Sequence, residues 1–336
     1  MQLFRRRRIS TLAGFALAIG TVLSLAPGKP LRAAAAGASS VPVYIVLRGQ
    51  DRSKITQIAS CPQVSGITLY YGWSSIEPKP GVYDFSQVLA NVDQAIAAGK
   101  KVNIALLPGR WSPAHVLNKA SSIRWEQRDM YVENNAGSQA NAPVPWDPAF
   151  ESSFTNAIAA FGKALSGRNI NSVAITGGSN TNGIEMNLHA TDAELRRIGF
   201  TPQKYIQAWE LYIDAYAKAF PNQVLTLAVH NQIGDSRNNE IPTQILDYAR
   251  HALGSRFYPT SFAFTGESWF QSGDPYVNLL LQHREGSHFG LQAIQVYSAK
   301  NDAAGFKNMI DKAAQFNPAW LEIWPKDLQA GYWSCK

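Results

Sequence analysis

The feature that most constrains this chain is a regular alternation of short runs rich in Val, Ile and Leu with longer helical patterns. The short runs recur at residues 43–47, 66–71, 102–107, 172–176, 224–229, 261–265, 291–297 and 320–324. Apolar residues spaced three and four apart predict helices at residues 85–98, 150–165, 202–220, 243–253 and 306–316. Strands that alternate with helices form parallel sheets, and eight such units close into a barrel. We therefore predict an α/β fold consisting of a single (β/α)8 TIM barrel.

Two stretches fit this alternation least well. The sixth strand is short, and so is the helix expected after it, around residues 276–281. Residues 120–148 form a long irregular stretch that contains Trp125, Tyr131, Trp146 and the acids Glu126, Asp129 and Glu133. Loops of this length are uncommon unless they are functional, and in a barrel this loop follows the third strand at the face where active sites are built.

The first 36 residues differ in character from the rest of the chain. Four arginines at positions 5–8 precede an apolar run over residues 12–25, and residues 33–36 are all alanine. This order is typical of a bacterial signal peptide, and the apolar run is shorter than the roughly 20 residues that span a bilayer. We predict that residues 1–36 are removed, that residues 37–336 form one barrel domain, and that the protein is exported to the periplasm or the medium without a membrane anchor.

The charge of the chain lies mostly in this N-terminal segment. Residues 1–40 carry six of the 31 Lys and Arg residues and none of the 24 acidic residues, so the remaining chain is nearly neutral. A nucleic-acid-binding protein needs a basic face that survives maturation, and no clustering of basic residues suggests one. We expect no nucleic-acid partner, and we expect a monomer.

Cysteine and histidine usage bears on redox state and on metal chemistry. Cys61 and Cys335 lie near opposite ends of the predicted domain, and in an exported protein they are expected to form a disulfide bond. The six histidines lack the spacing of metal ligands, and the motifs G-x-S-x-G, H-E-x-x-H, the P-loop and G-x-G-x-x-G after a strand are missing. The sequence therefore calls for no metal and no cofactor.

The second strand leads into a recognisable motif. The segment that begins at Tyr70 reads Y-Y-G-W-S-S-I-E-P-K-P-G-V-Y-D-F and fits the pattern W-S-x-x-E-P-x-x-G-x-Y-D-F. A helix, the letters G-K-K-V and a strand ending Leu107-Pro108-Gly109, with Pro113 beyond, follow it. Over residues 66–190 the chain resembles clan A glycoside hydrolases of the β-galactosidase and cellulase types. The resemblance implies a barrel enzyme that hydrolyses O-glycosidic bonds in a polysaccharide or oligosaccharide.

Part of this motif is structural. Pro78, Pro80 and Gly81 predict a turn, and Glu77 in such a loop is more often a hydrogen-bond partner than a catalyst. Tyr71 and Trp73 stand at the carboxyl end of the strand, where an aromatic ring can stack on a sugar. Packing at the barrel mouth explains these two aromatic residues equally well, so both interpretations stay open.

The candidate proton donor is Glu185. In clan A barrels a glutamate just past the fourth strand acts as the acid and base, and Glu185 lies about nine residues beyond that strand here, so the assignment requires the loop to fold back. Gly, Asn, Ile and Met surround Glu185 in sequence, and a partly desolvated carboxyl has the raised pKa that proton donation requires. The alternative is an ordinary loop carboxylate that binds backbone N–H groups.

Glycoside hydrolysis normally needs a second carboxylate. Clan A places it at the end of the seventh strand, where this chain has no glutamate. Glu322 lies within the eighth strand, and a charge in an apolar strand must face the barrel mouth or find a partner, for instance Lys326 or an arginine. Glu267 follows the sixth strand beside Trp269. We expect Glu322 or Glu267 to be the nucleophile or base, or the chain to lack one.

Other polar and aromatic residues fall at the predicted strand ends, where they can bind sugar hydroxyls or stack on sugar faces. The candidate substrate-binding residues, besides Tyr71 and Trp73, are Arg48, Asn180, His230, Asn231, Gln292, Gln295, Trp269 and Trp324. We predict a glycosidase with a carbohydrate substrate. The alternatives are a non-catalytic carbohydrate-binding barrel that has lost its nucleophile, and another hydrolase or lyase on the same fold.

Overall fold

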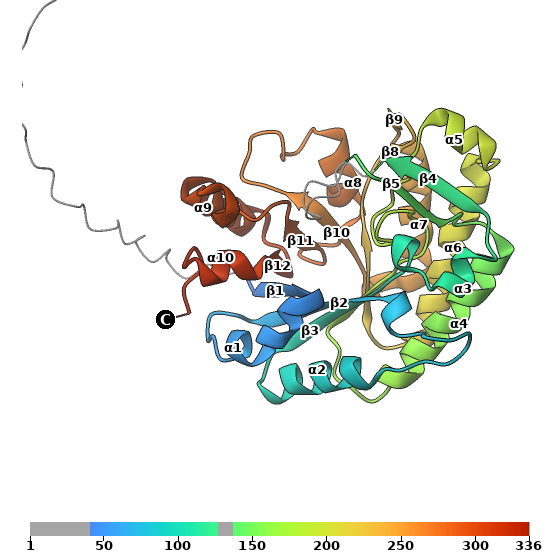
Figure 1. Ribbon diagram of the computed structural model, residues 1–336. Coiled ribbons are helices and arrows are strands. Elements are labelled where there is room, and N and C mark those ends of the chain that lie inside the picture. Colours follow the sequence, from blue (N-terminus) through green and yellow to red (C-terminus); the bar gives the residue numbers. More distant parts are fainter. Residues whose placement is uncertain (1–40, 127–136, 336) are drawn as a thin grey trace, which may run out of the picture. The chain divides into compact units, whose positions relative to one another are not determined.

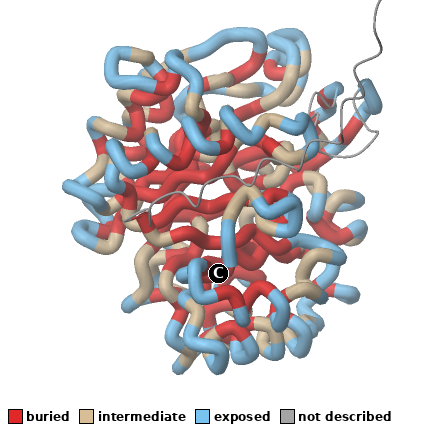
Figure 2. The backbone as a smooth tube through the Cα atoms, turned by 90° about the vertical axis from the view of Figure 1, so that its left-hand side faces the viewer, coloured by how far each residue is buried: buried red, intermediate tan, exposed pale blue. Residues whose placement is uncertain are grey.

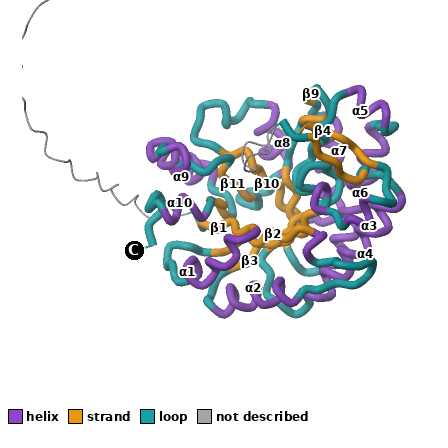
Figure 3. Tube along the Cα trace, in the orientation of Figure 1, coloured by secondary structure: helices purple, strands orange, loops and turns teal. Residues whose placement is uncertain are grey.

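The computed structural model describes residues 41–126 and 137–335, so the predicted signal peptide at residues 1–36 lies outside the described residues. Eight parallel strands form a closed barrel, and the helices lie around it (Figures 1 and 3). In barrel order the strands are β1 Val43–Arg48, β2 Gly66–Gly72, β3 Lys101–Leu107, β6 Ser172–Ala174, β7 Val224–Ala228, β10 Phe257–Phe264, β11 Gly290–Ala293 and β12 Trp320–Ile323. The predicted α/β barrel is confirmed.

The sixth and seventh strands differ from their predicted bounds. Strand β10 begins at Phe257, earlier than predicted, and its pairing with β11 shifts register between Ser261 and Phe264. Strand β11 ends at Ala293, before the predicted end at residue 297. The chain turns at Tyr297, where the N–H groups of Lys300 and Asp302 donate to the Tyr297 carbonyl.

Several of the described helices begin after a capping side chain. Asp147, Thr201, Asp274 and Asp302 each accept a hydrogen bond from the first turn of the helix that follows. A proline at the first helical position supports three of these starts. The helices are α1 Ile55–Ala59, α2 Ser86–Ala97, α3 Ala114–Leu117, α4 Pro148–Leu165, α5 Asp192–Arg197, α6 Pro202–Ala219, α7 Glu240–Leu253, α8 Pro275–His283, α9 Ala303–Phe316 and α10 Pro325–Gln329.

The strands are buried on both faces, and the two faces meet different neighbours (Figure 2). On β2, Leu69 and Tyr71 belong to the large apolar cluster that includes the helices, whereas Tyr70 packs with Val46 and Ala105 in a separate cluster. Successive side chains of a strand point to opposite faces. Tyr70 therefore faces the barrel interior and Tyr71 faces the helices.

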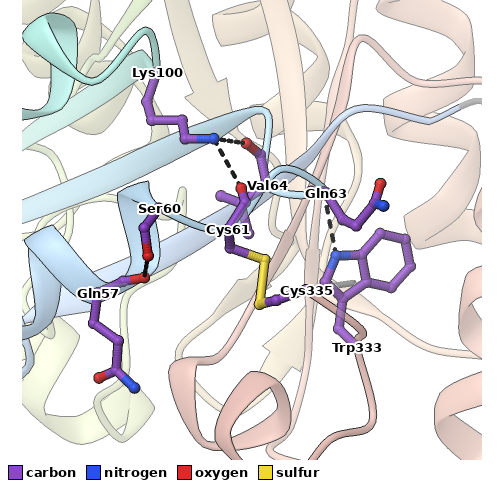
Figure 4. The surroundings of a disulfide bond; sticks show 8 residues. All are labelled: Gln57, Ser60, Cys61, Gln63, Val64, Lys100, Trp333 and Cys335. Carbon is purple, nitrogen blue, oxygen red and sulfur yellow. Dashed lines mark hydrogen bonds between the residues drawn. A yellow bond between two sulfur atoms is a disulfide. The ribbon is translucent and has the colours of Figure 1, made fainter.

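The predicted disulfide between Cys61 and Cys335 is present (Figure 4). It joins the segment after α1 to the C-terminal segment, with 4.8 Å between the two Cα atoms. Nearby, Trp333 Nε1 donates to the Gln63 carbonyl at 3.2 Å, and Lys100 Nζ donates to the Cys61 carbonyl at 2.8 Å. The disulfide and the Trp333 hydrogen bond hold the C-terminal segment against the segment that follows α1. Among the described residues, no helix has the length and apolar character needed to cross a membrane.

The stretch predicted to be irregular contains an antiparallel hairpin of β4 Ser122–Glu126 and β5 Gln139–Pro143. Trp125 is buried and Trp146 packs against Tyr205, so both indoles are used for packing. Asp129, Tyr131 and Glu133 lie outside the described residues.

Candidate active site at the barrel mouth

The chain after β6 leaves the fourth strand and returns to it. The Ile175 N–H donates to the Thr226 carbonyl at 2.7 Å, so in an unbroken parallel strand residue 177 would donate to Ala228. Met186 makes that bond instead, at 3.0 Å, and Glu185 forms a parallel bridge with Ala228. The loop therefore folds back as the assignment of Glu185 requires, and Glu185 occupies a position at the carboxyl end of the fourth strand.

The returning loop is held by buried polar contacts. Asn180 Nδ2 donates to the His189 carbonyl at 2.8 Å, and the His189 N–H donates to Asn180 Oδ1 at 3.0 Å. Gly183 has a φ of 78°, and a Cβ there would lie 2.4 Å from Pro108 Cδ, so only glycine fits. Asn180 is fully buried, and both ends of its amide are bonded to the backbone. These contacts favour a structural role for Asn180 over the predicted binding of substrate.

Glu185 is half-buried, and its charge acts on two buried tyrosines, Tyr276 and Tyr70. Burial, and then the charge of Glu185, raise the pKa of Tyr276 on α8. Burial and the charge of Glu322 raise the pKa of Tyr70, and Glu185 adds to that rise. Neither tyrosine was among the predicted site residues. The two-residue alternation of β2 places Tyr70 on the opposite face from Tyr71 and Trp73, but it does not tell which of the two faces lines the barrel interior.

Glu322 lies inside the barrel, 5% exposed, with neutral partners instead of the predicted cation. Its Oε1 accepts hydrogen bonds from Thr68 Oγ1 at 2.6 Å and Asn103 Nδ2 at 3.1 Å, and its Oε2 accepts one from Gln292 Nε2 at 2.7 Å. Burial raises the pKa of Glu322, and these hydrogen bonds oppose the rise. The carboxyl group is therefore enclosed by its own donors.

An apolar layer separates Glu322 from the mouth. Tyr70 and Ala105 each stand two residues beyond the Glu322 partners Thr68 and Asn103, on the same face of β2 and β3. The layer comprises Val46, Tyr70, Ala105 and Ile184. Trp324, two residues beyond Glu322 on β12, packs against this layer, and so does Phe262. Glu322 thus lies one level deeper in the barrel than the residues that face the mouth.

Glu267 lies outside this interior, in the exposed loop after β10. Its Oε2 accepts a hydrogen bond from Trp269 Nε1 at 3.0 Å, and its main-chain oxygen accepts one from Lys312 Nζ. The Trp269 ring, 37% exposed, lies 6.4 Å from the Tyr276 ring. Glu267 therefore binds the indole of Trp269, and the ring of Trp269 in turn approaches Tyr276.

The polar residues at the other strand ends are held in different ways. The Arg48 guanidinium lies 5.0 Å from the centre of the Trp324 ring, and Trp324 Nε1 donates to the Ala293 carbonyl at 2.9 Å. Asn231 Nδ2 donates to Asn239 Oδ1 at 2.9 Å, and Gln295 Oε1 accepts from Lys300 Nζ at 2.6 Å. Arg48 is exposed and Trp324 is half-buried.

His230 is a neutral side chain of fixed tautomer. Burial lowers its pKa to about 3, and the charges of His189 and Arg237 add to this effect. Its Nδ1 accepts the Gln232 N–H at 3.1 Å, so the proton of the neutral ring resides on Nε2. The ring lies 6.1 Å from the ring of Tyr276. His230 therefore presents an N–H donor near the mouth throughout the neutral pH range.

Tyr71, Trp73 and Glu77 are occupied in packing outside the barrel. Trp73 is fully buried against Phe154 and donates from Nε1 to Glu77 Oε2 at 2.6 Å. Tyr71 Oη accepts a hydrogen bond from Asn91 Nδ2 at 2.8 Å. Glu77 also accepts the Gly81 N–H at 2.8 Å, which agrees with the structural role predicted for it. The packing interpretation of the two aromatic residues is therefore favoured over sugar stacking.

A polar cavity of about 270 Å³ lies between the β4–β5 hairpin and the loops that follow Glu185 and β7; its lining includes Arg124, Trp125, His189, Glu194, Gln232 and Asp235. His189 connects it to the mouth, because its ring lies 6.0 Å from that of His230. Within residues 41–126 and 137–335, His, Cys, Asp and Glu form no group of three or more that could hold a metal ion.

Comparisons with known proteins agree with the fold. No protein-family model and no curated protein sequence matches the chain. A psychrophilic glycoside hydrolase family 10 endo-β-1,4-xylanase matches with a TM-score of 0.54 and 10% identity over 84% of this chain and 86% of that one. The native xylanase 10B from Thermotoga maritima matches with a TM-score of 0.51 and 9% identity over 85% and 83%. The chain thus shares the (β/α)8-barrel fold of these two xylanases.

A third similar structure is the exo-β-1,4-mannosidase Op5Man5 from Opitutaceae bacterium strain TAV5, with a TM-score of 0.49 and 13% identity. The match covers 87% of this chain but only 55% of the mannosidase chain. At these identities the likeness concerns the fold alone.

Proposed function

We propose that this protein is an exported glycoside hydrolase in which Glu185 protonates the glycosidic oxygen of a polysaccharide or oligosaccharide. The observation that carries the proposal is the returning loop, which sets Glu185 in the register of the fourth strand. This is the position implied by the resemblance to clan A barrels. The shared fold supports the assignment, as does the aromatic and polar lining near Glu185 at the mouth.

For the second carboxylate, exposure favours Glu267 over Glu322. The oxygens of Glu322 are engaged by three donors beneath an apolar layer, so a sugar at the mouth does not reach them. Glu267 is exposed to solvent and held by Trp269, and a carboxylate in contact with water suits the base of an inverting glycosidase. We therefore assign Glu267 as the base that activates water.

Export is part of the same proposal. The disulfide between Cys61 and Cys335 is compatible with an oxidising compartment, where such bonds persist. A secreted or periplasmic enzyme meets polysaccharides that a cytoplasmic protein does not.

The test is hydrolysis of a panel of polysaccharides and aryl glycosides by the purified mature protein. We expect Glu185→Gln to lower the rate by about 10²- to 10⁴-fold, the usual contribution of general acid catalysis, while sugar binding measured by calorimetry persists. We expect Glu267→Gln to lower the rate as well. Glu240→Gln, the same change in the first turn of α7, serves as the matched control and should be neutral. Equal rates for wild type and Glu185→Gln would disprove the assignment.

One observation favours a second candidate function. Strand β11 holds no carboxylate, and the one on β12 is enclosed, which is what a carbohydrate-binding barrel without a nucleophile would show. If the wild-type protein binds members of the panel but cleaves none of them, this second function replaces the first.

A further inference from the structure

We propose that Glu322 is a positioning residue for Tyr70. Acting through Gln292, it directs the O–H bond of Tyr70 into the mouth, where Tyr70 donates a hydrogen bond to an oxygen atom of the substrate bound beside Glu185. The inference deepens the proposed function and rests on it for the identity of the ligand, a sugar that offers a hydroxyl or glycosidic oxygen. It gives the enclosed glutamate a role other than nucleophile.

The first link joins Glu322 to Gln292. Glu322 Oε2 accepts a hydrogen bond from Gln292 Nε2 at 2.7 Å. A carboxylate oxygen only accepts hydrogen bonds, so Gln292 must present its NH2 group rather than its carbonyl. Gln292 presents its NH2 group also when Glu322 is protonated on Oε1. In that form Oε1 donates its hydrogen to the Thr68 hydroxyl 2.6 Å away, which can accept as well as donate, and Oε2 stays an acceptor. In the ionised form of Glu322, and in the form protonated on Oε1, the amide of Gln292 thus has one orientation.

The second link joins Gln292 to Tyr70. The same Nε2 atom donates its other hydrogen to Tyr70 Oη at 2.6 Å. The phenolic oxygen is therefore the acceptor in this bond, and the phenolic hydrogen must point away from Gln292. Glu322 imposes this direction through Gln292, because it leaves Gln292 no other way to bind both neighbours.

The third link is the direction in which that hydrogen points. Val46, Ala105 and Ile184 surround Tyr70 inside the barrel, and their side chains accept no hydrogen bond. Glu185 and Arg48, both at the carboxyl ends of strands, act electrostatically on Tyr70. Tyr70 itself is 8% exposed. The hydroxyl hydrogen is therefore directed toward the mouth, where Glu185 lies.

The kinetic test uses variants that keep the shape of these side chains. Glu322→Gln lets the amide of Gln292 turn over, so the Tyr70 hydroxyl can donate inward, and the double variant E322Q/Q292E fixes it inward with the same number of atoms. On the substrate found in the hydrolysis panel, we expect each to lower kcat about tenfold, and we expect the same loss from Tyr70→Phe. E322Q/Y70F should be no slower than Y70F alone. If E322Q/Y70F instead loses kcat by the product of the two single-variant factors, the inference is overturned.

A second measurement, by NMR, does not depend on catalytic activity. In protein labelled with ¹³C at the tyrosine Cζ, the signal missing from Tyr70→Phe identifies Tyr70. We expect that signal to move in Glu322→Gln and in E322Q/Q292E. The signal of Tyr44, which pairs with Glu322 and whose pKa the charge of Glu322 also raises, is set aside. The remaining tyrosine signals should stay in place, which also shows that the variants fold. If the Tyr70 signal stays at its wild-type position in folded Glu322→Gln, the positioning role is wrong. If it moves in a protein that cleaves no sugar, the proposed function fails and the positioning by Glu322 stands.

Discussion

Glu185 and Glu322 are glutamates at strand positions of the same barrel, yet their surroundings are opposite. Glu185 reaches the carboxyl end of the fourth strand by a returning loop and is half-buried at the mouth. Glu322 lies within a regular strand, one level deeper, where three side-chain donors enclose it. The level of a carboxylate along the barrel axis, and not its membership of a strand, therefore decides whether it is accessible from the mouth.

The largest expected effect concerns the stability that each glutamate provides. Glu322→Ala leaves the donors of Thr68, Asn103 and Gln292 without their acceptor in the interior, and we expect it to lower the free energy of unfolding by about 3–5 kcal/mol. Glu185→Ala, at the half-exposed mouth, should cost about 1 kcal/mol or less. Urea unfolding of the disulfide-bonded mature protein measures both values. Equal losses would remove the distinction between the two sites.

The next effect tests how the loop places Glu185. Gly183→Ala requires a Cβ 2.4 Å from Pro108 Cδ at a φ of 78°, whereas Gly167→Ala has a φ of 80° with open space around it. Both changes carry the backbone cost of about 1–2 kcal/mol, so their difference isolates the clash. We expect Gly183→Ala to be less stable than Gly167→Ala by about 1–3 kcal/mol and to lose hydrolysis. Similar stability and activity in the two variants would show that the loop does not need this close contact.

The smallest effect is a change in the pH dependence of stability. Burial holds the pKa of Glu322 above its usual value, so the folded protein binds this proton more tightly than the unfolded chain does. The stabilisation is complete below the unfolded pKa, about 4.3, and is lost as pH rises through the raised pKa. We expect Glu322→Gln to lessen the decline that wild type shows above this pH, and urea midpoints from pH 4 to 8 measure it. An unchanged pH dependence of the urea midpoint in the variant would mean that the pKa of Glu322 is the same in the folded protein and in the unfolded chain.

The sequence predicts the repeating parts of this molecule well. All eight barrel strands and the disulfide follow from local patterns and from compartment chemistry, because strand composition and cysteine count are local properties. The role of Glu185 could be predicted only from the resemblance to clan A barrels together with a loop that folds back. In the sequence, Glu185 stands nine residues past the predicted strand.

Two features of the site could not be read from the sequence. Parallel strands are buried on both faces, so the run Tyr70-Tyr71 does not reveal which ring faces the barrel, and the predicted aromatic pair Tyr71 and Trp73 lies on the other face. The depth of Glu322 depends on how strands from distant parts of the chain stagger, because Thr68 and Asn103 approach it across more than 200 residues. Such long-range register leaves no local pattern.

The most direct test of the difference between the two glutamates is chemical labelling of the native mature protein with a water-soluble carbodiimide and glycine ethyl ester, followed by peptide mass spectrometry. The account predicts that Glu185 is modified, and that Glu322 stays unmodified until urea unfolds the chain. Modification of Glu322 in the folded protein at the rate of Glu185, or protection of Glu185, would contradict it.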